Sequence, residues 1–256
     1  MNFNQKIKTF AAYRNLFRNW PYAAFARYLG RCYPRPRLLR FRDGRKLVFR
    51  PASDAFVLGE VFIMEVYAQC LKGPEPVRVW DVGGNVGAFP VWLSGYFPRA
   101  TYVSFEPCAE SFTLLEQTRR GNQHIAWVTH PYGLSDKDEV VEGRIPPGHC
   151  AKTSAFAQEG RRVSLPLRSV DAVWREKESP RIDLLKLDCE GGEYDILLGC
   201  SDAFLRAVHS IIGETHIIPG HHPEQLRHRL NASGFHVKWY TGKRGIFRAT
   251  RDMAGR

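Results

Sequence analysis

The chain of 256 residues contains 37 Lys and Arg against 26 Asp and Glu, which gives a formal net charge of +11. A hydrophobic content of 44% and a charged content of 25% are ordinary for a globular protein, and the length excludes more than one α/β domain with an appendage or two small domains. The positive charge favours an anionic partner: nucleic acid, an acidic lipid surface, or a phosphorylated or acidic substrate.

The six cysteines lie far apart and never form a C-x-x-C pair, so they indicate neither a zinc site nor a disulfide framework. We expect reduced thiols and a cytoplasmic location. Lys6, Lys8, Arg14 and Arg18 interrupt the apolar core that a signal peptide would need. The longest stretch without charge, 82–98, contains four glycines and two prolines, which argues against a membrane span.

The first 75 residues are expected to form an extension made of a helix, a hairpin and a second helix. Aromatic residues three or four positions apart predict a helix over 3–29, which would pack on its own domain or act as a surface anchor or a lid. Alternating apolar residues in 38–50, around Asp43 and Gly44, predict a β-hairpin. Ser53-Asp54 would cap a helix that stops near residues 73–74.

From residue 77 onward, predicted strands and helices alternate. Strands are expected over 77–81, 101–105, 125–129, 182–187 and 210–213, near 139–145 and 162–167, and as a closing pair over 235–240 and 245–249. Helices are expected over 88–97, 109–121, 193–198 and 223–233, with another opened by Ser169 or Asp171. This alternation predicts an α/β fold with a doubly wound, mostly parallel sheet and an antiparallel hairpin at or near one edge. The expected units are the extension 1–75, the main domain 76–250 and a basic tail 251–256.

The segment 81–89, DVGGNVGAF, would end the first strand of this sheet and open the next helix. Gly83 and Gly87 allow a tight turn and close approach of a ligand to the backbone. Glu106 ends the second strand, 25 residues after Asp81, where an acid can bind both hydroxyls of a ribose. Together these residues predict a nucleoside cofactor. Asn85 stands where the dinucleotide pattern has its second glycine, which disfavours a nicotinamide dehydrogenase.

Three segments, DVGGNVGAF, FEP and LLKLDCEGGEYDILLG, resemble the signature segments of FkbM-type S-adenosylmethionine-dependent methyltransferases. The resemblance extends over about residues 38–240, and the third segment is its most specific part. It implies a Rossmann-like sheet of seven strands, S-adenosyl-L-methionine as cofactor, and methylation of a hydroxyl on a sugar, glycolipid or natural product. By position, the resemblance implies that a loop around the methionine part of the cofactor is formed by Asp81, Gly83, Asn85 and Gly87. It also implies that Glu106 binds the ribose and that Ser135 and Asp136 lie beside the adenine.

The third segment places Asp188 and Glu190 at a strand end, where the resemblance implies that they face the transferred methyl group. The next strand ends with Glu214 and His216 at the same edge of the sheet. We hypothesise that these four side chains share acceptor binding and deprotonation. Their carboxylate oxygens and imidazole nitrogens could also bind a divalent cation, although the spacing of these residues in the sequence does not require one. Glu193 is interpreted as a charge in the first turn of a helix.

Two rival functions are compatible with these residues. An RNA methyltransferase would suit the charge, but the chain has no N/D-P-P-Y/F tetrapeptide and no RNA-binding module, so a nucleic-acid partner is disfavoured. A scaffold without turnover would bind the cofactor and form no product. The acceptor is expected to be a small molecule or a glycan bound by 139–170 and the N-terminal helices, and Lys152, Arg161 and Arg162 suggest that it carries an anionic group. The basic N-terminal helix leaves peripheral membrane contact open, and the oligomeric state is not predicted.

Overall fold

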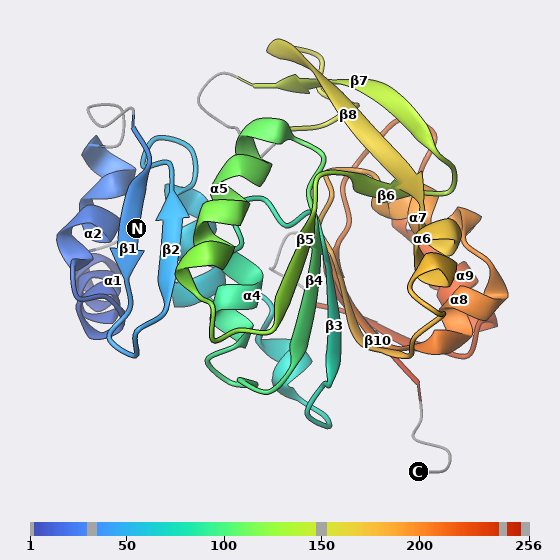
Figure 1. The fold of residues 1–256 in the computed structure, drawn as a ribbon, viewed down its shortest axis with the longest axis horizontal. Helices are drawn as coiled ribbons and strands as arrows, with labels where there is room; N and C mark the ends of the chain where they lie inside the picture. Colours follow the sequence, from blue (N-terminus) through green and yellow to red (C-terminus); the bar gives the residue numbers. More distant parts are fainter. Residues whose placement is uncertain (1–2, 30–34, 147–152, 241–244, 252–256) are drawn as a thin grey trace.

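A seven-stranded sheet organises the computed structural model, which describes residues 3–29, 35–146, 153–240 and 245–251 (Figure 1). Its strand order is β11-β12-β10-β9-β3-β4-β5, and all neighbours are parallel except β12, which runs antiparallel to β10 and β11. The mostly parallel sheet and its closing hairpin are therefore confirmed. The strands are β3 (Arg78–Val82), β4 (Thr101–Phe105), β5 (Trp127–His130), β9 (Ile182–Leu187), β10 (Val208–Glu214), β11 (His236–Trp239) and β12 (Ile246–Thr250).

Helices cover both faces of this sheet, as a doubly wound fold requires (Figure 1). One face carries α4 (Ala88–Leu93) and α5 (Ala109–Gly121), and the other carries α6 (Val170–Glu176), α7 (Glu193–Gly199), α8 (Asp202–Ala207) and α9 (Pro223–Ala232). The chain passes from β3 outward to β5 and then returns to β9 on the other side of β3. In open sheets of this kind, ligands bind at the carboxyl ends of the strands where the order reverses, which here is between β3 and β9.

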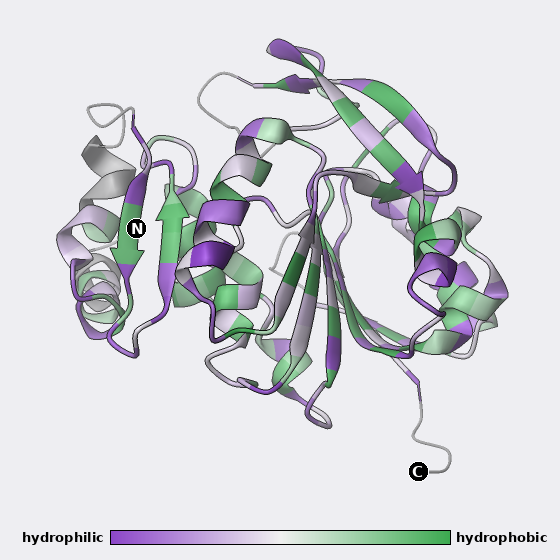
Figure 2. Ribbon diagram, viewed as in Figure 1, coloured by the Kyte–Doolittle hydropathy of each residue, from purple (hydrophilic) through white to green (hydrophobic). Residues whose placement is uncertain are grey.

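The central strands are buried on both faces, which explains their nearly continuous apolar sequence (Figure 2). In β9 every residue except Asp183 is buried, and in β3 every residue after Arg78 is buried. Two apolar clusters form the core, one on each face of the sheet. Buried charged residues within these strands, Asp81 and Lys186, are therefore exceptions that need a partner.

A smaller sheet lies beyond the upper end of the central sheet in the view of Figure 1. It contains β6 (Gly133–Ser135), β7 (Glu139–Ile145) and β8 (Arg161–Ser169) in the order β6-β8-β7. The expected strands near 139–145 and 162–167 are present, whereas the three-residue β6 and the short helix α8 were not expected. Both are too short to show a periodic apolar pattern.

The N-terminal segment forms two helices, α1 (Phe3–Leu16) and α2 (Trp20–Leu29), instead of the single helix expected over 3–29. The break between them has a tertiary cause: Phe17 pairs as an isolated bridge with Phe41, and the side chain of Asn19 bonds the backbone of the hairpin. The hairpin itself, β1 (Arg37–Arg40) and β2 (Lys46–Phe49), is confirmed. None of the described helices combines the length and apolar character needed to cross a bilayer.

The segment after the hairpin contains three short helical pieces: α3 (Ala55–Leu58), the π-helical turn η2 (Gly59–Ile63) and the 3₁₀ turn η3 (Ala68–Leu71). Asp54 precedes α3 but does not cap it, because its carboxylate bonds the backbone and guanidinium of Arg50. Aromatic side chains from α1, the hairpin and η2 join the apolar cluster that also contains α4. The extension thus packs directly on the main sheet. The predicted tail after residue 251 lies outside the described residues, as do residues 147–152 of the section 139–170 that was expected to bind the acceptor.

Candidate active site

A cavity of about 330 Å³ opens at the carboxyl ends of β3, β4, β9 and β10. The extension supplies its opposite wall through Phe56, Val57, Glu60, Val61 and Tyr67. The strand ends therefore form one side of the cavity and the segment before η3 forms the other. Of the eleven site residues predicted from the sequence, seven line the cavity: Gly83, Asn85, Glu106, Asp188, Glu190, Glu214 and His216.

The turn after β3 has a backbone that requires glycine at two positions. Gly83 has a φ of 79°, and a Cβ there would lie 1.8 Å from the carbonyl oxygen of Asp188. Gly87 has a φ of 86°, and its Cβ would lie 2.5 Å from the ring of Trp127. The turn can therefore approach the end of β9 at Gly83 and the ring of Trp127 at Gly87 only because neither residue has a side chain.

Glu106 lies in the cavity wall at the end of β4, where the sequence predicted a ribose-binding acid. Its carboxylate accepts hydrogen bonds from the backbone N–H groups of Asn85, at 2.7 Å, and Cys108, at 2.9 Å. Burial raises the pKa of Glu106 to about 7 even though both amides favour the charged form. The side chain is therefore fixed in place and titrates near neutral pH.

Asp81 does not line the cavity but supports the turn from inside the sheet. It is fully buried, and its carboxylate lies 3.0 Å from the Nζ atom of Lys186 and accepts a bond from Ser104 at 2.9 Å. Lys186 also donates to the carbonyl of Gly83 at 2.7 Å. Burial acts to lower the pKa of Lys186, but the charges of Asp81 and Asp188 and the hydrogen bond to Asp81 together outweigh it and raise the pKa. Lys186 was not among the site residues predicted from the sequence, although a lysine inside the apolar run of β9 was the available signal.

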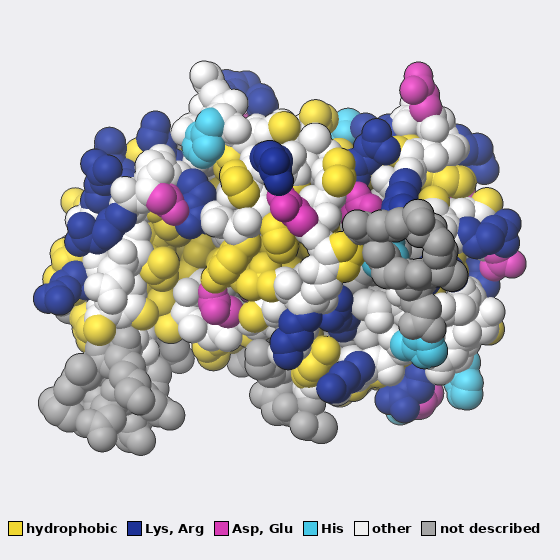
Figure 3. Space-filling view, turned by 90° about the horizontal axis from the view of Figure 1, so that it is seen from below, with side chains coloured by type: hydrophobic (Ala, Val, Ile, Leu, Met, Phe, Trp, Pro, Cys, Tyr) yellow, Lys and Arg dark blue, Asp and Glu magenta, His cyan; other side chains and the backbone are white. Residues whose placement is uncertain are grey.

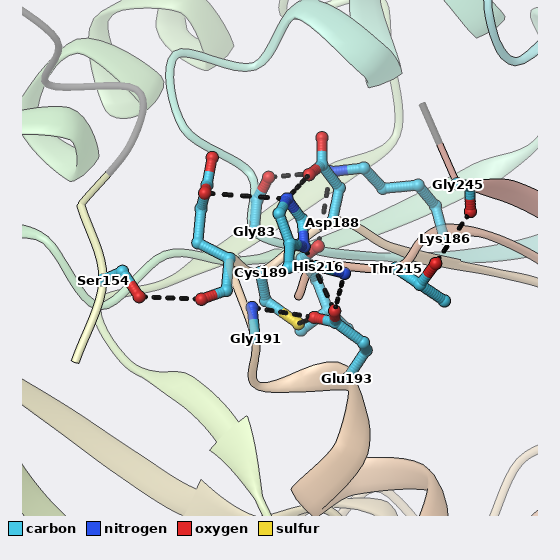
Figure 4. Close-up of polar contacts among 12 residues, drawn as sticks. Gly83, Ser154, Lys186, Asp188, Cys189, Gly191, Glu193, Thr215, His216 and Gly245 are labelled. Atoms are coloured by element: carbon cyan, nitrogen blue, oxygen red, sulfur yellow. Dashed lines mark hydrogen bonds and ion pairs between the residues drawn. The ribbon is translucent and has the colours of Figure 1, made fainter. Parts of the chain in front are cut away.

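His216 brings the predicted acid–base residues together, and Figure 4 shows its ring beside Asp188. Its Nε2 atom lies 3.6 Å from a carboxylate oxygen of Glu190 and 4.0 Å from one of Asp188. Glu214 lies in the same group: one ligand atom each from Asp188, Glu214 and His216 fall within 4.8 Å of one another. The four side chains proposed from two separate segments thus form one cluster at the cavity.

Glu193 holds this cluster from behind, a role that its position in the first turn of α7 did not reveal. Its buried carboxylate accepts bonds from the backbone N–H groups of Gly191, at 2.9 Å, and His216, at 2.7 Å, and lies 3.1 Å from Nδ1 of the His216 ring (Figure 4). Burial alone would lower the pKa of His216, but Glu193, together with Asp188 and Glu190, raises it to about 9. The ring is therefore held as an imidazolium near neutral pH, with Nδ1 toward Glu193 and Nε2 toward Asp188 and Glu190.

Two further interactions set the protonation of the cluster. Tyr67, from the extension, donates its hydroxyl to Asp188 at 2.7 Å. Burial and the charge of Asp188 raise the pKa of Tyr67 well above its usual value, so it stays a hydrogen-bond donor. Burial, followed by the charge of Asp188, raises the pKa of Glu214 to about 8. Glu214 therefore titrates in the range where proton acceptors are most effective.

Ser135 and Asp136, predicted to lie beside the adenine, are not part of the cavity wall. Ser135 is buried and donates to Asp136 at 3.1 Å, and Asp136 packs against Gly199 of α7. Their contact with the cofactor stays a prediction, as do the individual roles of the other site residues.

The family of the chain follows from a comparison with protein-family models. Residues 81–237, which include the turn after β3, Glu106 and the whole acid–base cluster, match the model described as "Methyltransferase FkbM domain". The chain belongs to the FkbM methyltransferase family. The predicted family is thus confirmed, and with it an S-adenosylmethionine-dependent methyltransferase activity.

The curated relatives that the chain matches differ widely in length, as the share of each relative that is covered shows. Methyltransferase 1 of Beauveria bassiana is 23% identical over 200 residues, which cover 69% of this chain and 80% of the relative. Hexuronic acid methyltransferase AglP of Haloferax volcanii is 29% identical over 146 residues, which cover 57% of this chain and 58% of the relative. AMB antimetabolite synthetase AmbE of Pseudomonas aeruginosa is 30% identical over 200 residues, which cover 63% of this chain but only 9% of AmbE.

Proposed function

We propose that the protein transfers a methyl group from S-adenosylmethionine to a hydroxyl oxygen of a sugar or of a glycan or natural product that presents such a ring. The single observation that carries the proposal is the cluster of three carboxylates and one histidine at the cavity, opposite an apolar and aromatic wall. A relative is named for methylating a hexuronic acid, which supports a sugar acceptor.

The donor side of the cavity has the chemistry that S-adenosylmethionine needs. Gly83 and Gly84 leave backbone exposed at the cavity, and the carboxylate of Glu106 is presented by two amides as an acceptor for the ribose hydroxyls. Lys186 and Asp81 would keep this turn rigid. When bound, the cofactor supplies a methyl group on a positively charged sulfonium, for which the nearby carboxylates are electrostatic complements.

On the acceptor side, we assign Glu214 as the base that accepts the proton of the acceptor's hydroxyl group. Transfer forms a carbon–oxygen bond and breaks a carbon–sulfur bond, while the hydroxyl proton passes to a base. A carboxylate whose pKa is about 8 matches a hydroxyl better than an ordinary exposed glutamate does. Asp188, held by Tyr67, and Glu190, beside His216, would orient the acceptor's hydroxyls so that the reacting oxygen is aligned. Alignment of this kind can contribute roughly 7–11 kcal/mol to catalysis.

The lining of the cavity contains more carboxylates than cations, the cations being Lys186 and His216, so it does not single out the anionic acceptor suggested by the sequence. Five carboxylates line the cavity: those of Glu60, Glu106, Asp188, Glu190 and Glu214. The arginines that suggested an anionic group are paired instead, Arg161 with Glu110 and Arg162 with Glu142, and Lys152 lies outside the described residues. An acidic cavity also speaks against a polynucleotide acceptor.

A divalent cation is an alternative means of activating the hydroxyl. Asp188, Glu214 and His216 offer two carboxylates and an imidazole at distances that one ion could bridge. The test is methyl transfer after treatment with EDTA and after readdition of Mg²⁺ or Mn²⁺. Loss of turnover with recovery would favour the cation, and unchanged turnover would favour Glu214 acting alone.

The proposed function can be tested by separating donor binding from turnover. S-adenosylmethionine binding is measured by calorimetry, and formation of S-adenosylhomocysteine is measured with neutral methyl glycosides and a methyl hexuronide as acceptors. Glu214→Gln, Glu190→Gln and His216→Ala should each lower turnover at least about a hundredfold while retaining donor affinity. The matched changes Glu224→Gln and His228→Ala, on the exposed side of α9, should have no effect.

Two results would contradict the proposal. Full turnover in all three cavity variants would refute the acid–base assignment. Tight donor binding without product from any ring-bearing acceptor would favour a scaffold that binds the cofactor without turnover.

A further inference from the structure

The net positive charge of this protein comes almost entirely from its first 42 residues. Ten of the 37 Lys and Arg residues and none of the 26 Asp and Glu residues lie in this segment, so it accounts for ten of the eleven units of net charge. The remaining 214 residues are nearly neutral, and the cavity is acidic. The signal for an anionic partner therefore belongs to the N-terminal segment and not to the acceptor site.

The fold gathers part of this charge into one cluster. Phe17 and Phe41 pair, which brings the end of α1 against the hairpin and places Arg14, Arg18, Arg40 and Arg42 close together; we call these four residues the arginine cluster. Arg42 donates to the carbonyl of Arg14 at 2.9 Å, and the backbone N–H of Arg18 donates to the carbonyl of Arg40 at 2.7 Å.

All four residues of the arginine cluster are exposed. Within the described ranges, no ion pair joins them to a carboxylate, and the first acid in the sequence, Asp43, is bound by Arg45 at 2.6 Å. Figure 3 shows several Lys and Arg side chains on the end of the molecule that carries α1, α2 and the hairpin, besides others on the rest of this face. A concentration of like charge without acidic partners costs free energy through repulsion, which an external anionic surface would relieve.

An exposed aromatic residue accompanies the basic ones. Tyr22 of α2 keeps 49% of its surface accessible, and the guanidinium of Arg37 lies 5.9 Å from the centre of its ring. Tyrosine and arginine each combine an apolar body with a polar end, which suits the boundary between lipid headgroups and acyl chains.

We propose that the arginine cluster, with Tyr22 and Arg37, docks the protein on the surface of a bilayer that contains anionic lipids. The contact is peripheral, since none of the described helices could span a bilayer. A nucleic acid is the less suitable partner, because a polynucleotide drawn toward the enzyme would meet five carboxylates at the cavity. A bilayer engages the basic surface and leaves the cavity free for its acceptor.

The proposal is tested by sedimentation of the full chain with vesicles of phosphatidylcholine alone or of phosphatidylcholine with 30% phosphatidylglycerol. Binding should require the anionic lipid and should weaken steeply between 0.1 and 0.5 M salt. Each arginine at such a surface contributes about fivefold in affinity, so Arg14→Gln/Arg40→Gln should bind roughly 25-fold more weakly. S-adenosylmethionine binding by this variant should be unchanged, which shows that it is folded.

The matched control removes the same charge elsewhere. Arg175→Gln/Arg206→Gln alters exposed arginines on α6 and α8, on the opposite side of the sheet, and should bind anionic vesicles like the unmodified protein. Equal weakening in both double variants would overturn the proposal, because it would show a general effect of net charge. Absence of binding to anionic vesicles, or binding to single-stranded RNA alone, would overturn it as well.

Discussion

Replacing Glu193 by Gln tests whether this residue sets the charge of the acid–base cluster. The change keeps the shape of the side chain but removes the negative charge that lies 3.1 Å from Nδ1 of His216. In the structure His216 has a pKa of about 9 against an ordinary value of 6.5. That difference corresponds to roughly 3 kcal/mol of preference for the imidazolium, and it exists although burial acts in the opposite direction.

The expected result is a fall in the pKa of His216 toward 6.5, because Asp188 and Glu190 alone must then offset burial. The assay is an NMR titration of the His216 ring, assigned by its loss in His216→Ala. Glu224→Gln, on the exposed first turn of α9, is the control and should leave the titration unchanged. A His216 that titrates near 9 in Glu193→Gln would refute the reasoning, since the buried carboxylate would then not be its main partner.

The same change should alter the dependence of stability on pH. In the unmodified protein the folded pKa of His216 is above its unfolded value, so the stabilisation is complete below pH 6.5 and is lost as pH rises through about 9. Urea unfolding should show this decline, with an upper limit of roughly 3 kcal/mol, in the unmodified protein but not in Glu193→Gln. Other titrating groups, such as Glu214, contribute to both proteins and cancel in the difference.

Three further predictions concern the donor side. Gly83→Ala should destabilise the protein by at least 2 kcal/mol more than Gly44→Ala, as measured by urea unfolding, because both have positive φ but only the Cβ at Gly83 meets backbone; equal costs would show that the contact is not tight. Lys186→Met should cost about 3–5 kcal/mol because it leaves Asp81 as an uncompensated buried charge, and an unchanged melting temperature would contradict this. Calorimetric affinity for S-adenosylmethionine should fall as pH drops through about 7, where Glu106 becomes protonated, and Glu106→Gln should bind weakly with no such pH dependence.

The sequence predicted the parts of this protein whose physical signal is local or periodic. The strands of the central sheet are continuous apolar runs because they are buried on both faces, and the turn after β3 needs glycine for reasons of backbone geometry. The convergence of Asp188 and Glu190 with Glu214 and His216 followed from the rule that parallel strands end at one edge of a sheet.

Contacts between distant segments could not be predicted in this way. Tyr67 contacts Asp188, which lies 121 positions later in the chain, and Glu193 at the start of α7 contacts His216 in the loop after β10. Neither pairing leaves a pattern in the local sequence. The break between α1 and α2 likewise depends on Phe41 and on the backbone around Arg40, which only the folded hairpin provides.

The two walls of the cavity come from parts of the chain that can vary independently. Six residues between 53 and 67 line one wall, whereas Gly83, Asn85 and Glu106 follow the ends of β3 and β4 on the other. Substitutions in that short segment would change the shape of the cavity wall without altering the residues proposed to bind the cofactor. The same sheet could therefore serve proteins that accept different substrates. Tyr67 is the exception in this segment, because a substitution that removed its hydrogen bond to Asp188 would alter the acid–base cluster itself.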